Sequence, residues 1–427
     1  MKILNSNSKN FDKNLDSFLL QRKKKVQSNS VSVTNIIKDV KNNGDKALLK
    51  YEKKFNKNNT IVPTPMQISK SIKLLDKKVK QAIDIAYNRI YRFHSLQKFK
   101  NISYIDKFKN KLEYKYIPLE SVAIYVPGST ASYPSSVLMN AIPAIIAGVK
   151  RIIMINPGFK GKQNPAVLYA ARKCKIREIY SIGGPSAIAA AAYGTKKINK
   201  VNKIVGPGNE YVAAAKKEVF GDVGIEGMTA GPSEVTIVCD KFSNLEWVAS
   251  DLIGQAEHSS LAQCILISKD KSLINNIQNE IINQLKKIPR LSIARKSLMS
   301  NGILMYINSE KKIIEVVNKI APEHLELNVK NYKSLASKIK NCGSICLGKY
   351  AVMAMTDYNV GSNHILPTNG SAEYSSGVSV NEFYKRISYI KLSKKGIESL
   401  GPSAITLANY EGLVGHAQSI KKRIRRK

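Results

Sequence analysis

Four of the five histidines stand in short polar stretches, where an imidazole could bind a metal ion or move a proton. The stretch Gln255-Ala-Glu-His258 places Gln255 and His258 three residues apart. On a helix, that spacing brings both side chains to one face, about 5 to 6 Å apart at Cβ, so both could reach one metal ion. The polar end of a solvated helix has the same pattern, and the spacing leaves both interpretations open.

An acid and an imidazole stand side by side in Pro322-Glu323-His324. Imidazole titrates near neutrality and can accept a proton from an alcohol, while a carboxylate can activate water, so the pair suits general-base chemistry. The alternative is structural, because Pro322 could occupy the first position of a helix and its two neighbours would then point in different directions.

Asp357 and His416 could complete a metal site with Gln255 and His258. Asp357 lies in the polar stretch TDYNVGSNHI, which also contains His364, and His416 lies in EGLVGH. The four side chains would supply nitrogen and oxygen donors without a thiolate, as in catalytic zinc sites that leave one position open for substrate. Taken singly, each could instead be a loop or surface residue.

The turn Gly206-Pro-Gly-Asn209 precedes a helical stretch, and a helix N-terminus attracts phosphate. The turn does not match the dinucleotide fingerprint GxGxxG, because Tyr211 stands where the third glycine would be. An ordinary turn from a strand to a helix is the competing interpretation.

The elements that must position these residues alternate between β-branched strands and alanine-rich helices. We expect a first series with strands at 121–126, 151–155, 178–182 and 201–205, and helices at 136–147, 166–173, 187–193 and from 209 to 219. A second series has strands at 234–239, 264–268, 303–308 and 344–347, and helices at 245–257, 273–285 and 311–320. This alternation predicts βαβ units and parallel sheets.

The two ends of the chain have a different texture. The first hundred residues are lysine-rich, and the apolar positions of 68–90 recur at helical spacing, which predicts one amphipathic helix there. The tail from Phe383 onward is interpreted as helical and basic. The expected fold class is therefore α/β, with two Rossmann-like parallel-sheet domains in tandem and small helical extensions at the termini.

Composition excludes several classes of protein. Of 427 residues, 43% are apolar, which indicates a folded chain, and 68 Lys and Arg oppose 31 Asp and Glu. The resulting net charge of +37 is scattered without interleaved aromatic residues, so no specific nucleic-acid partner is expected. We expect neither a membrane span nor a secretory signal, and five cysteines without a CxxC pair indicate reduced thiols in a cytoplasmic protein.

Several short motifs, taken in order, resemble the histidinol dehydrogenase family. They are IYVPG, PSSVLMNAIPA, KIVGPGNEYV, AGPSE, GQAEH, APEHLEL, TDYNVGSNHILPT and EGLVGH, and they extend from about residue 121 to 416. The resemblance implies oxidation of L-histidinol to L-histidine through an aldehyde, in two NAD-dependent steps, with one zinc ion per site of a homodimer.

The resemblance also assigns roles to individual residues. His324 would be the base toward the alcohol and Glu323 the activator of water. His416 and Glu411 would come from the partner subunit of the homodimer. The implied zinc ligands are Gln255, His258, Asp357 and His416; the substrate contacts are Ser233, Gln255, His258, His324, Asp357, Glu411 and His416; the NAD contacts are Tyr125, Ser186 and Asn209.

We expect four structural units. Residues 1–20 would be an extension that packs with the tail, and 21–120 together with 234–380 would form a first α/β domain that holds the zinc and catalytic residues. Residues 121–233 would form a second, NAD-binding domain, and 381–427 a helical region that contributes to the partner's site.

One position departs from the family's pattern. Ser186 stands where the pattern commonly has glutamine at a cofactor contact, and the shorter side chain suggests weaker NAD binding or a contact through water. The ligand set and Glu323 also allow an alternative function, a zinc-dependent hydrolase on a similar scaffold.

Overall fold

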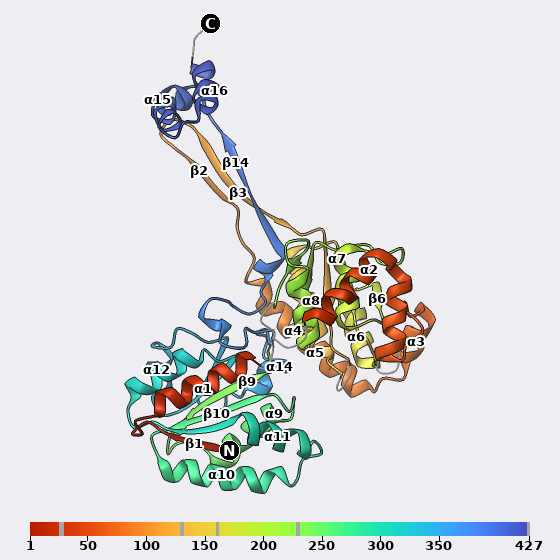
Figure 1. Ribbon diagram of the computed structural model, residues 1–427, viewed down its shortest axis with the longest axis vertical. Helices are drawn as coiled ribbons and strands as arrows, with labels where there is room; N and C mark the ends of the chain where they lie inside the picture. The colour runs from red at the N-terminus through yellow and green to blue at the C-terminus, as the bar shows by residue number, and fades with distance from the viewer. Residues whose placement is uncertain (25–29, 129–131, 159–161, 228–230, 425–427) are drawn as a thin grey trace.

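The computed structural model describes residues 1–24, 30–128, 132–158, 162–227 and 231–424. Two parallel β-sheets with flanking helices form the body of the molecule, and a narrow arm projects away from it (Figure 1). The predicted fold class, two Rossmann-like α/β domains in tandem, is confirmed.

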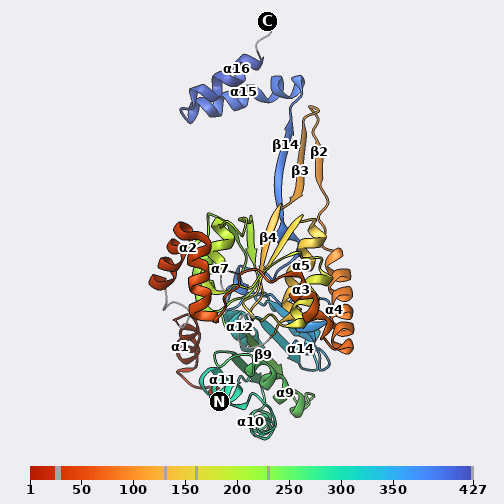
Figure 2. The same ribbon diagram turned by 90° about the vertical axis from the view of Figure 1, so that its right-hand side faces the viewer.

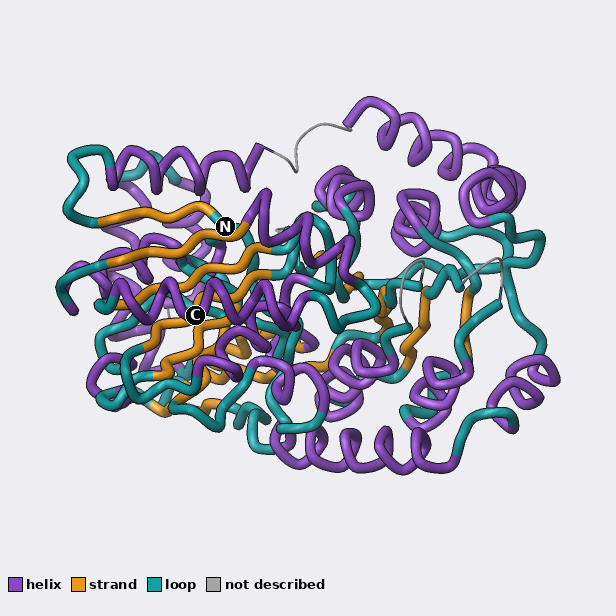
Figure 3. The backbone as a smooth tube through the Cα atoms, turned by 90° about the horizontal axis from the view of Figure 1, so that it is seen from below, coloured by secondary structure: helices purple, strands orange, loops and turns teal. Residues whose placement is uncertain are grey.

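The first sheet has six parallel strands and lies near the N-terminus in Figure 1. Helices cover both of its faces, as Figure 3 shows from below. One face packs on α1 (Phe11–Lys24), α12 (Glu310–Ile320) and α13 (Tyr332–Ala336), and the other on α9 (Leu245–Ala256), α10 (Lys271–Leu285) and α11 (Leu291–Asn301). The strands, in spatial order, are β1 (Lys2–Asn5), β11 (Gly302–Tyr306), β10 (Gln263–Ser268), β9 (Glu234–Cys239), β12 (His324–Asn328) and β13 (Ser344–Leu347).

The second sheet has five parallel strands, in the order β6 (Glu178–Tyr180), β5 (Arg151–Ile155), β4 (Ser121–Tyr125), β7 (Lys203–Val205) and β8 (Gly224–Ile225). Its strands are buried on both faces, which explains their continuous apolar runs. One face packs on α3 (Pro65–Lys73), α4 (Lys77–Ser95), α5 (Pro134–Ala147) and α6 (Pro165–Lys173), and the other on α2 (Ser30–Tyr51), α7 (Gly184–Tyr193) and α8 (Glu210–Glu218).

Both sheets follow the same winding rule. The first strand of each series, β4 or β9, lies in the middle; two strands are added on one side, and the chain then crosses to the other side. The crossing places the first and fourth strands, β4 with β7 and β9 with β12, next to each other. In such folds, ligands bind where the winding direction changes.

The structure differs from the expected units in the N-terminal region. Residues 30–95 were assigned to the first domain, but α2, α3 and α4 pack on the five-stranded sheet. The apolar stripe of α2, with Val33, Ile37 and Val40, lies in one core cluster with the alanines of α7. An amphipathic helix does not itself specify which sheet buries its apolar face, so the sequence could not decide this.

The expected packing of residues 1–20 against the tail is also wrong within this chain. β1 pairs with β11 along its whole length, and Phe11, Leu15 and Leu19 of α1 are buried in the core of the six-stranded sheet. The tail lies at the opposite end of the molecule (Figure 1). β1 pairs with the backbone N–H and C=O groups of β11, which would otherwise be an unpaired edge of the sheet, and this explains why the segment stays with the sheet.

The arm is a three-stranded antiparallel sheet made of β2 (Ile102–Ile105), β3 (Lys111–Pro118) and β14 (Tyr384–Lys391). It carries α15 (Lys394–Tyr410) and α16 (Val414–Ile424) at its far end (Figures 1 and 2). The prediction of a helical tail from Phe383 onward is therefore wrong for β14. All eight residues of β14 pair with β3, a partner more than 260 residues earlier in the chain, which no local pattern could reveal.

Two further elements correct the sequence-based prediction. The stretch 68–90 is two helices, because Asp76 caps α4 by accepting hydrogen bonds from the backbone N–H groups of Lys78 and Val79. Residues 324–328, which were assigned to no strand, form β12 between β9 and β13. By contrast, β9 and β13 have the predicted limits.

All five cysteines are free, and burial raises the pKa of the Cys174, Cys239 and Cys264 thiols to about 12. A thiol with so high a pKa is unreactive at neutral pH, as expected of core residues. Among the described residues, no helix is long and apolar enough to cross a membrane.

Candidate active site

The predicted acid–base pair lies at the amino end of the central strands of the six-stranded sheet. α12 ends at Ile320; Ala321 caps it with a left-handed backbone of φ 45°, and Pro322 follows, so the chain leaves the helix and enters β12 at His324. The alternative interpretation of Pro322 as the start of a helix is therefore wrong. Ser233, the predicted substrate contact, directly precedes the neighbouring strand β9 at the same edge.

Glu323 is a buried carboxyl with one fixed oxygen. Its Oε2 accepts a hydrogen bond of 2.7 Å from the backbone N–H of Glu234, and its Oε1 lies 3.9 Å from His324 Nε2. Burial raises the pKa of Glu323 well above its usual value, and the carboxylates of Glu234 and Asp357 add to the effect. A carboxylate with a raised pKa is a stronger base, as activation of water requires.

His324 lies between two carboxyl groups. Its Nε2 is 3.9 Å from Asp357 Oδ1 as well as from Glu323, and its Nδ1 is buried without a partner among the described residues. Burial lowers the pKa of His324 to about 3, with smaller contributions from His364 and His258. The imidazole is therefore neutral at pH 7, the protonation state from which a general base acts.

Asp357 belongs to the short helix α14 (Met353–Tyr358) and contacts His364. The backbone oxygen of Asp357 lies 2.8 Å from His364 Nδ1, and its Oδ1 lies 4.0 Å from the same nitrogen. His364 Nε2 in turn lies 3.4 Å from the hydroxyl of Ser136, at the start of α5. His364 and Ser136 therefore link the two domains at the site, and no role was predicted for either from the sequence.

Gln255 lies in the last turn of α9, and His258 follows just beyond the helix, where its charge would act on His324 and His364. Gln255 is 1% exposed, and neither atom of its amide group has a partner among the described residues. Burial lowers the pKa of His258, which favours the neutral imidazole that binds metals. An unpartnered buried amide is costly, so the Gln255 oxygen fits a metal ligand that completes its coordination with a bound ion.

No group of three His, Cys, Asp or Glu side chains within the described ranges is already arranged around a metal position. Gln255, His258 and Asp357 supply an amide oxygen, an imidazole and a carboxylate, which fit zinc, but a fourth ligand is needed to complete the site. The predicted fourth ligand, His416, is exposed on α16, and Glu411 is exposed at the end of α15. Both lie at the far end of the arm, away from the site of their own chain (Figure 2).

The predicted NAD contacts lie at the carboxyl edge of the five-stranded sheet. Tyr125 ends β4, and its hydroxyl accepts a hydrogen bond of 3.1 Å from the backbone N–H of Gly184, where α7 begins. A Cβ atom at Gly206 would collide with the backbone of Tyr125, so the turn before α8 requires glycine. Two helix N-termini thus flank Tyr125, an arrangement suited to the phosphates of a dinucleotide.

The other two predicted NAD contacts have partners within the protein. Asn209 caps α8 through a hydrogen bond from the backbone N–H of Val212 and is otherwise exposed. Ser186 is buried, and its hydroxyl donates to the carbonyl oxygen of Gly183 over 3.1 Å. Asn209 is accessible to a ligand, whereas the Ser186 hydroxyl already has an acceptor.

A residue that sequence reasoning missed supports this turn. Glu52, at the end of α2, accepts a hydrogen bond of 2.8 Å from the backbone N–H of Gly183, and burial raises its pKa to about 7. It lies in a single π-helical turn, Glu52–Asn56, a local distortion frequent at functional sites. No sequence motif marks this position.

Comparison with known proteins connects the chain to one family. The family model described as histidinol dehydrogenase matches residues 19–424. A histidinol dehydrogenase from Pelagibacter ubique is 79% identical over 427 residues, all of both chains, and one from Acinetobacter baylyi is 43% identical over 92% of each chain. The crystal structure of histidinol dehydrogenase from Elizabethkingia anophelis is similar with a TM-score of 0.92 and 37% identity, over 99% of this chain and 98% of the other.

Proposed function

The chain belongs to the histidinol dehydrogenase family, and on this premise we propose that it oxidises L-histidinol to L-histidine through L-histidinaldehyde, using NAD and zinc. Family membership makes it an oxidoreductase of histidine biosynthesis that acts on histidinol, so the zinc hydrolase is no longer an alternative. The observation that carries the proposal is the buried group of Glu323, His324 and Asp357, with His324 Nε2 3.9 Å from each carboxyl.

Gln255, His258 and Asp357 would hold the metal. The support is the Gln255 amide, which is buried without a partner among the described residues next to two further donors. When bound there, zinc would supply a Lewis acid that holds the amine and imidazole of histidinol and orients its alcohol.

The alcohol step uses His324. Its neutral imidazole accepts the hydroxyl proton while a hydride leaves the same carbon for NAD, which gives the aldehyde, NADH and one proton. Burial of the site keeps bulk water away from the reacting carbon.

The aldehyde step uses Glu323. Its carboxylate accepts a proton from water as the oxygen adds to the aldehyde carbon and returns that proton to the former carbonyl oxygen, which gives a hydrate. Loss of a second hydride to another NAD, with His324 accepting the hydroxyl proton, gives the carboxylic acid and a second NADH. The two oxygens of Glu323 suit this role, since the backbone N–H of Glu234 holds Oε2 while Oε1 lies on the side of His324, 3.9 Å from its Nε2.

NAD would bind at the carboxyl edge of the five-stranded sheet, with Tyr125, Ser186 and Asn209 as contacts. The support is the pair of helix N-termini at α7 and α8, which meet beside Tyr125.

A homodimer would supply the missing ligand, His416, together with Glu411, from the partner's arm. The support is that α15, α16 and the arm expose many large apolar side chains, among them Ile102, Ile105, Ile390, Leu407 and Tyr410. A second copy of the chain would bury this surface and complete both sites.

The first experiment counts NADH. Purified protein is incubated with L-histidinol and NAD, with and without a chelator, and the NADH formed per histidinol is measured by absorbance. Two NADH per histidinol, lost with chelator and restored by zinc, is the expected result. A single NADH, or turnover without NAD, contradicts the proposal.

Shared sites have their own test. His324→Ala and His416→Ala are each inactive, but a mixture that exchanges subunits regains roughly a quarter of wild-type activity, because half of the dimers are hybrids with one intact site. No recovery after proven exchange contradicts a site shared between subunits.

A further inference from the structure

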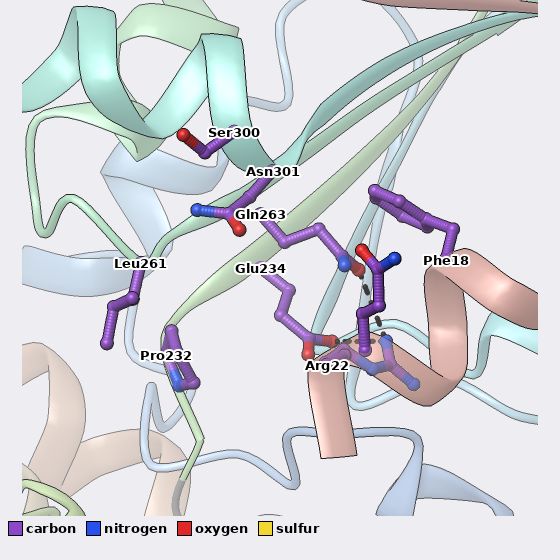
Figure 4. Close-up of a pocket in the computed structure, with 9 residues that line it drawn as sticks. Phe18, Arg22, Pro232, Glu234, Leu261, Gln263, Ser300 and Asn301 are labelled. Carbon is purple, nitrogen blue, oxygen red and sulfur yellow. Dashed lines mark hydrogen bonds and ion pairs between the residues drawn. The ribbon is translucent and has the colours of Figure 1, made fainter. Parts of the chain in front are cut away.

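A single buried side chain, Arg22, connects helix α1 to the region behind Glu323. Its Nη1 donates hydrogen bonds to Glu234 Oε2 at 3.2 Å and Gln263 Oε1 at 3.3 Å, and its Nη2 donates to the carbonyl oxygen of Ile320 at 3.2 Å. Figure 4 shows the guanidinium of Arg22 turned toward Glu234 and Gln263. One charged group thus joins the starts of β9 and β10 to the end of α12.

Glu234 connects Arg22 to Glu323, through its side chain on one side and its backbone N–H on the other. Its carboxylate accepts from Arg22 through Oε2 and from the backbone N–H of Asn369 through Oε1, at 3.0 Å. The backbone N–H of Glu234 donates a hydrogen bond to Glu323 Oε2 at 2.7 Å. The position of Glu234 therefore sets the position of the catalytic carboxyl.

Arg22 also acts on the other side of Glu323. Ile320, whose carbonyl oxygen it binds, is the last residue of α12, only three residues before Glu323. A cation at a helix C-terminus is favourable because the last carbonyls carry a partial negative charge. Both segments that flank Glu323 are thus held by one guanidinium.

The surroundings of Arg22 are adapted to its guanidinium. Arg22 and Glu234 line a small pocket that is partly open to solvent (Figure 4). Gly370 makes room for the guanidinium, because a Cβ atom there would lie 2.7 Å from Arg22 Nη2. Burial raises the pKa of Glu234 while the charge of Arg22 opposes the shift, so without Arg22 the buried carboxylate would protonate or move.

We propose that Arg22 is a positioning residue for the aldehyde step: through Glu234 and Ile320 it holds Glu323 where one carboxylate oxygen can activate water. This inference rests on the proposed function, in which Glu323 acts on water and His324 acts on the alcohol. Within the described ranges, the hydrogen bonds of Arg22 go to Glu234, Gln263 and Ile320 and not to His324, so its loss should affect the second oxidation more than the first.

The test separates the two oxidations. Arg22→Met and Arg22→Lys are compared with wild type in NAD-dependent oxidation of L-histidinol and, separately, of L-histidinaldehyde. We expect kcat for the aldehyde to fall about 10- to 100-fold, since small displacements of a catalytic group have effects of that size, while alcohol oxidation changes less than about threefold. NADH per histidinol should then fall from two toward one, with aldehyde released.

A matched control keeps α1 but removes a different ion pair. Asp12, on the same helix, forms an ion pair with Lys312 at 2.9 Å on the surface, and Asp12→Asn should leave both oxidations unchanged.

A double variant tests the role of the buried charges. Glu234→Gln combined with Arg22→Met removes both charges, and aldehyde oxidation should partly recover relative to Arg22→Met alone because no unpaired charge remains.

The outcomes are distinct. Equal losses in both oxidations of a folded Arg22 variant, or no loss in either, overturn the role of Arg22 while the two-NADH result of wild type stands. If Arg22→Met does not fold, Arg22→Lys, which keeps the charge but not the forked donor geometry, decides by the same ratio. A wild-type protein that forms one NADH per histidinol overturns the proposed function and this inference with it.

Discussion

The two sheets have the same winding order but use opposite edges. The five-stranded sheet presents its carboxyl edge, with the N-termini of α7 and α8, to the proposed nucleotide site. The six-stranded sheet presents its amino edge, where α9 and α12 end, to the proposed acid–base and metal-binding residues. Helix N-termini attract anions and helix C-termini attract cations, so the same topology favours a phosphate at one edge and a cation at the other.

Because the two edges are proposed to have different roles, substitutions at each edge should have different effects. Changes at the amino edge should stop the chemistry with little effect on nucleotide binding, and changes at the carboxyl edge should alter nucleotide affinity with little effect on the chemistry.

The largest effect is expected for His324→Ala. Loss of the base should reduce NADH formation by about 10²- to 10⁴-fold, while the dissociation constant for NAD, measured by calorimetry, stays within about twofold. A large loss of NAD affinity in a folded variant would break the separation between the two edges. Near-normal turnover would remove His324 as the base.

The next effect concerns Gln255→Leu. The substitution removes two buried polar atoms without partners among the described residues, so the metal-free protein should gain stability, by about 1 kcal/mol, and its Tm should rise. The same variant should lose most of the Tm increase that zinc gives wild type, and at least about tenfold in activity. A variant that binds zinc as wild type does would show that Gln255 is not a ligand.

A smaller effect is expected for Glu52→Gln, at the carboxyl edge. Burial raises the pKa of Glu52 from 4.5 to about 7, so its contribution to stability is present below about pH 4.5 and is lost as pH rises through 7. The glutamine variant avoids that loss and should be more stable than wild type at pH 8 but not at pH 4, by on the order of 3 kcal/mol. Melting curves at both pH values test this.

Glu52→Gln should also change the affinity for NAD. Removal of a negative charge next to the start of α7 should tighten NAD binding by about two- to fivefold. Unchanged NAD affinity would show that the phosphates do not lie at this helix. Asp222→Asn, at an exposed carboxylate that binds Tyr193 at the other end of α7, is a matched control.

The smallest effect is expected for Ser186→Gln. A longer side chain at the start of α7 should lower KM for NAD, by about two- to threefold, if the serine weakens the contact. KM for histidinol should not change. An unchanged KM for NAD would show that this departure from the family's pattern does not affect cofactor binding.

Much of the fold was predictable because many strands and helices have local sequence patterns, such as apolar runs bounded by turn residues. The limits of β9 and β13 match the prediction, since β9 is a β-branched run and turn residues bound both strands. β12 was missed because His324, Glu326 and Asn328 interrupt its apolar pattern with polar side chains that are buried only in the folded sheet. β14 was missed because its partner β3 is distant in sequence.

The amino-acid sequence specifies which residue types are available and in what order: Gln255 with His258, Glu323 with His324, Asp357 with His364, and the glycine turns before α7 and α8. Which of these residues meet depends on long-range packing. His324 and Asp357 come within 3.9 Å because α14 folds back toward the amino end of β12, while His416 lies at the end of the arm. Arg22 carries no motif at all. Its place behind Glu323 depends on β1 and α1 packing on the six-stranded sheet, and long-range packing of this kind is set by complementary apolar surfaces that no short stretch of sequence contains.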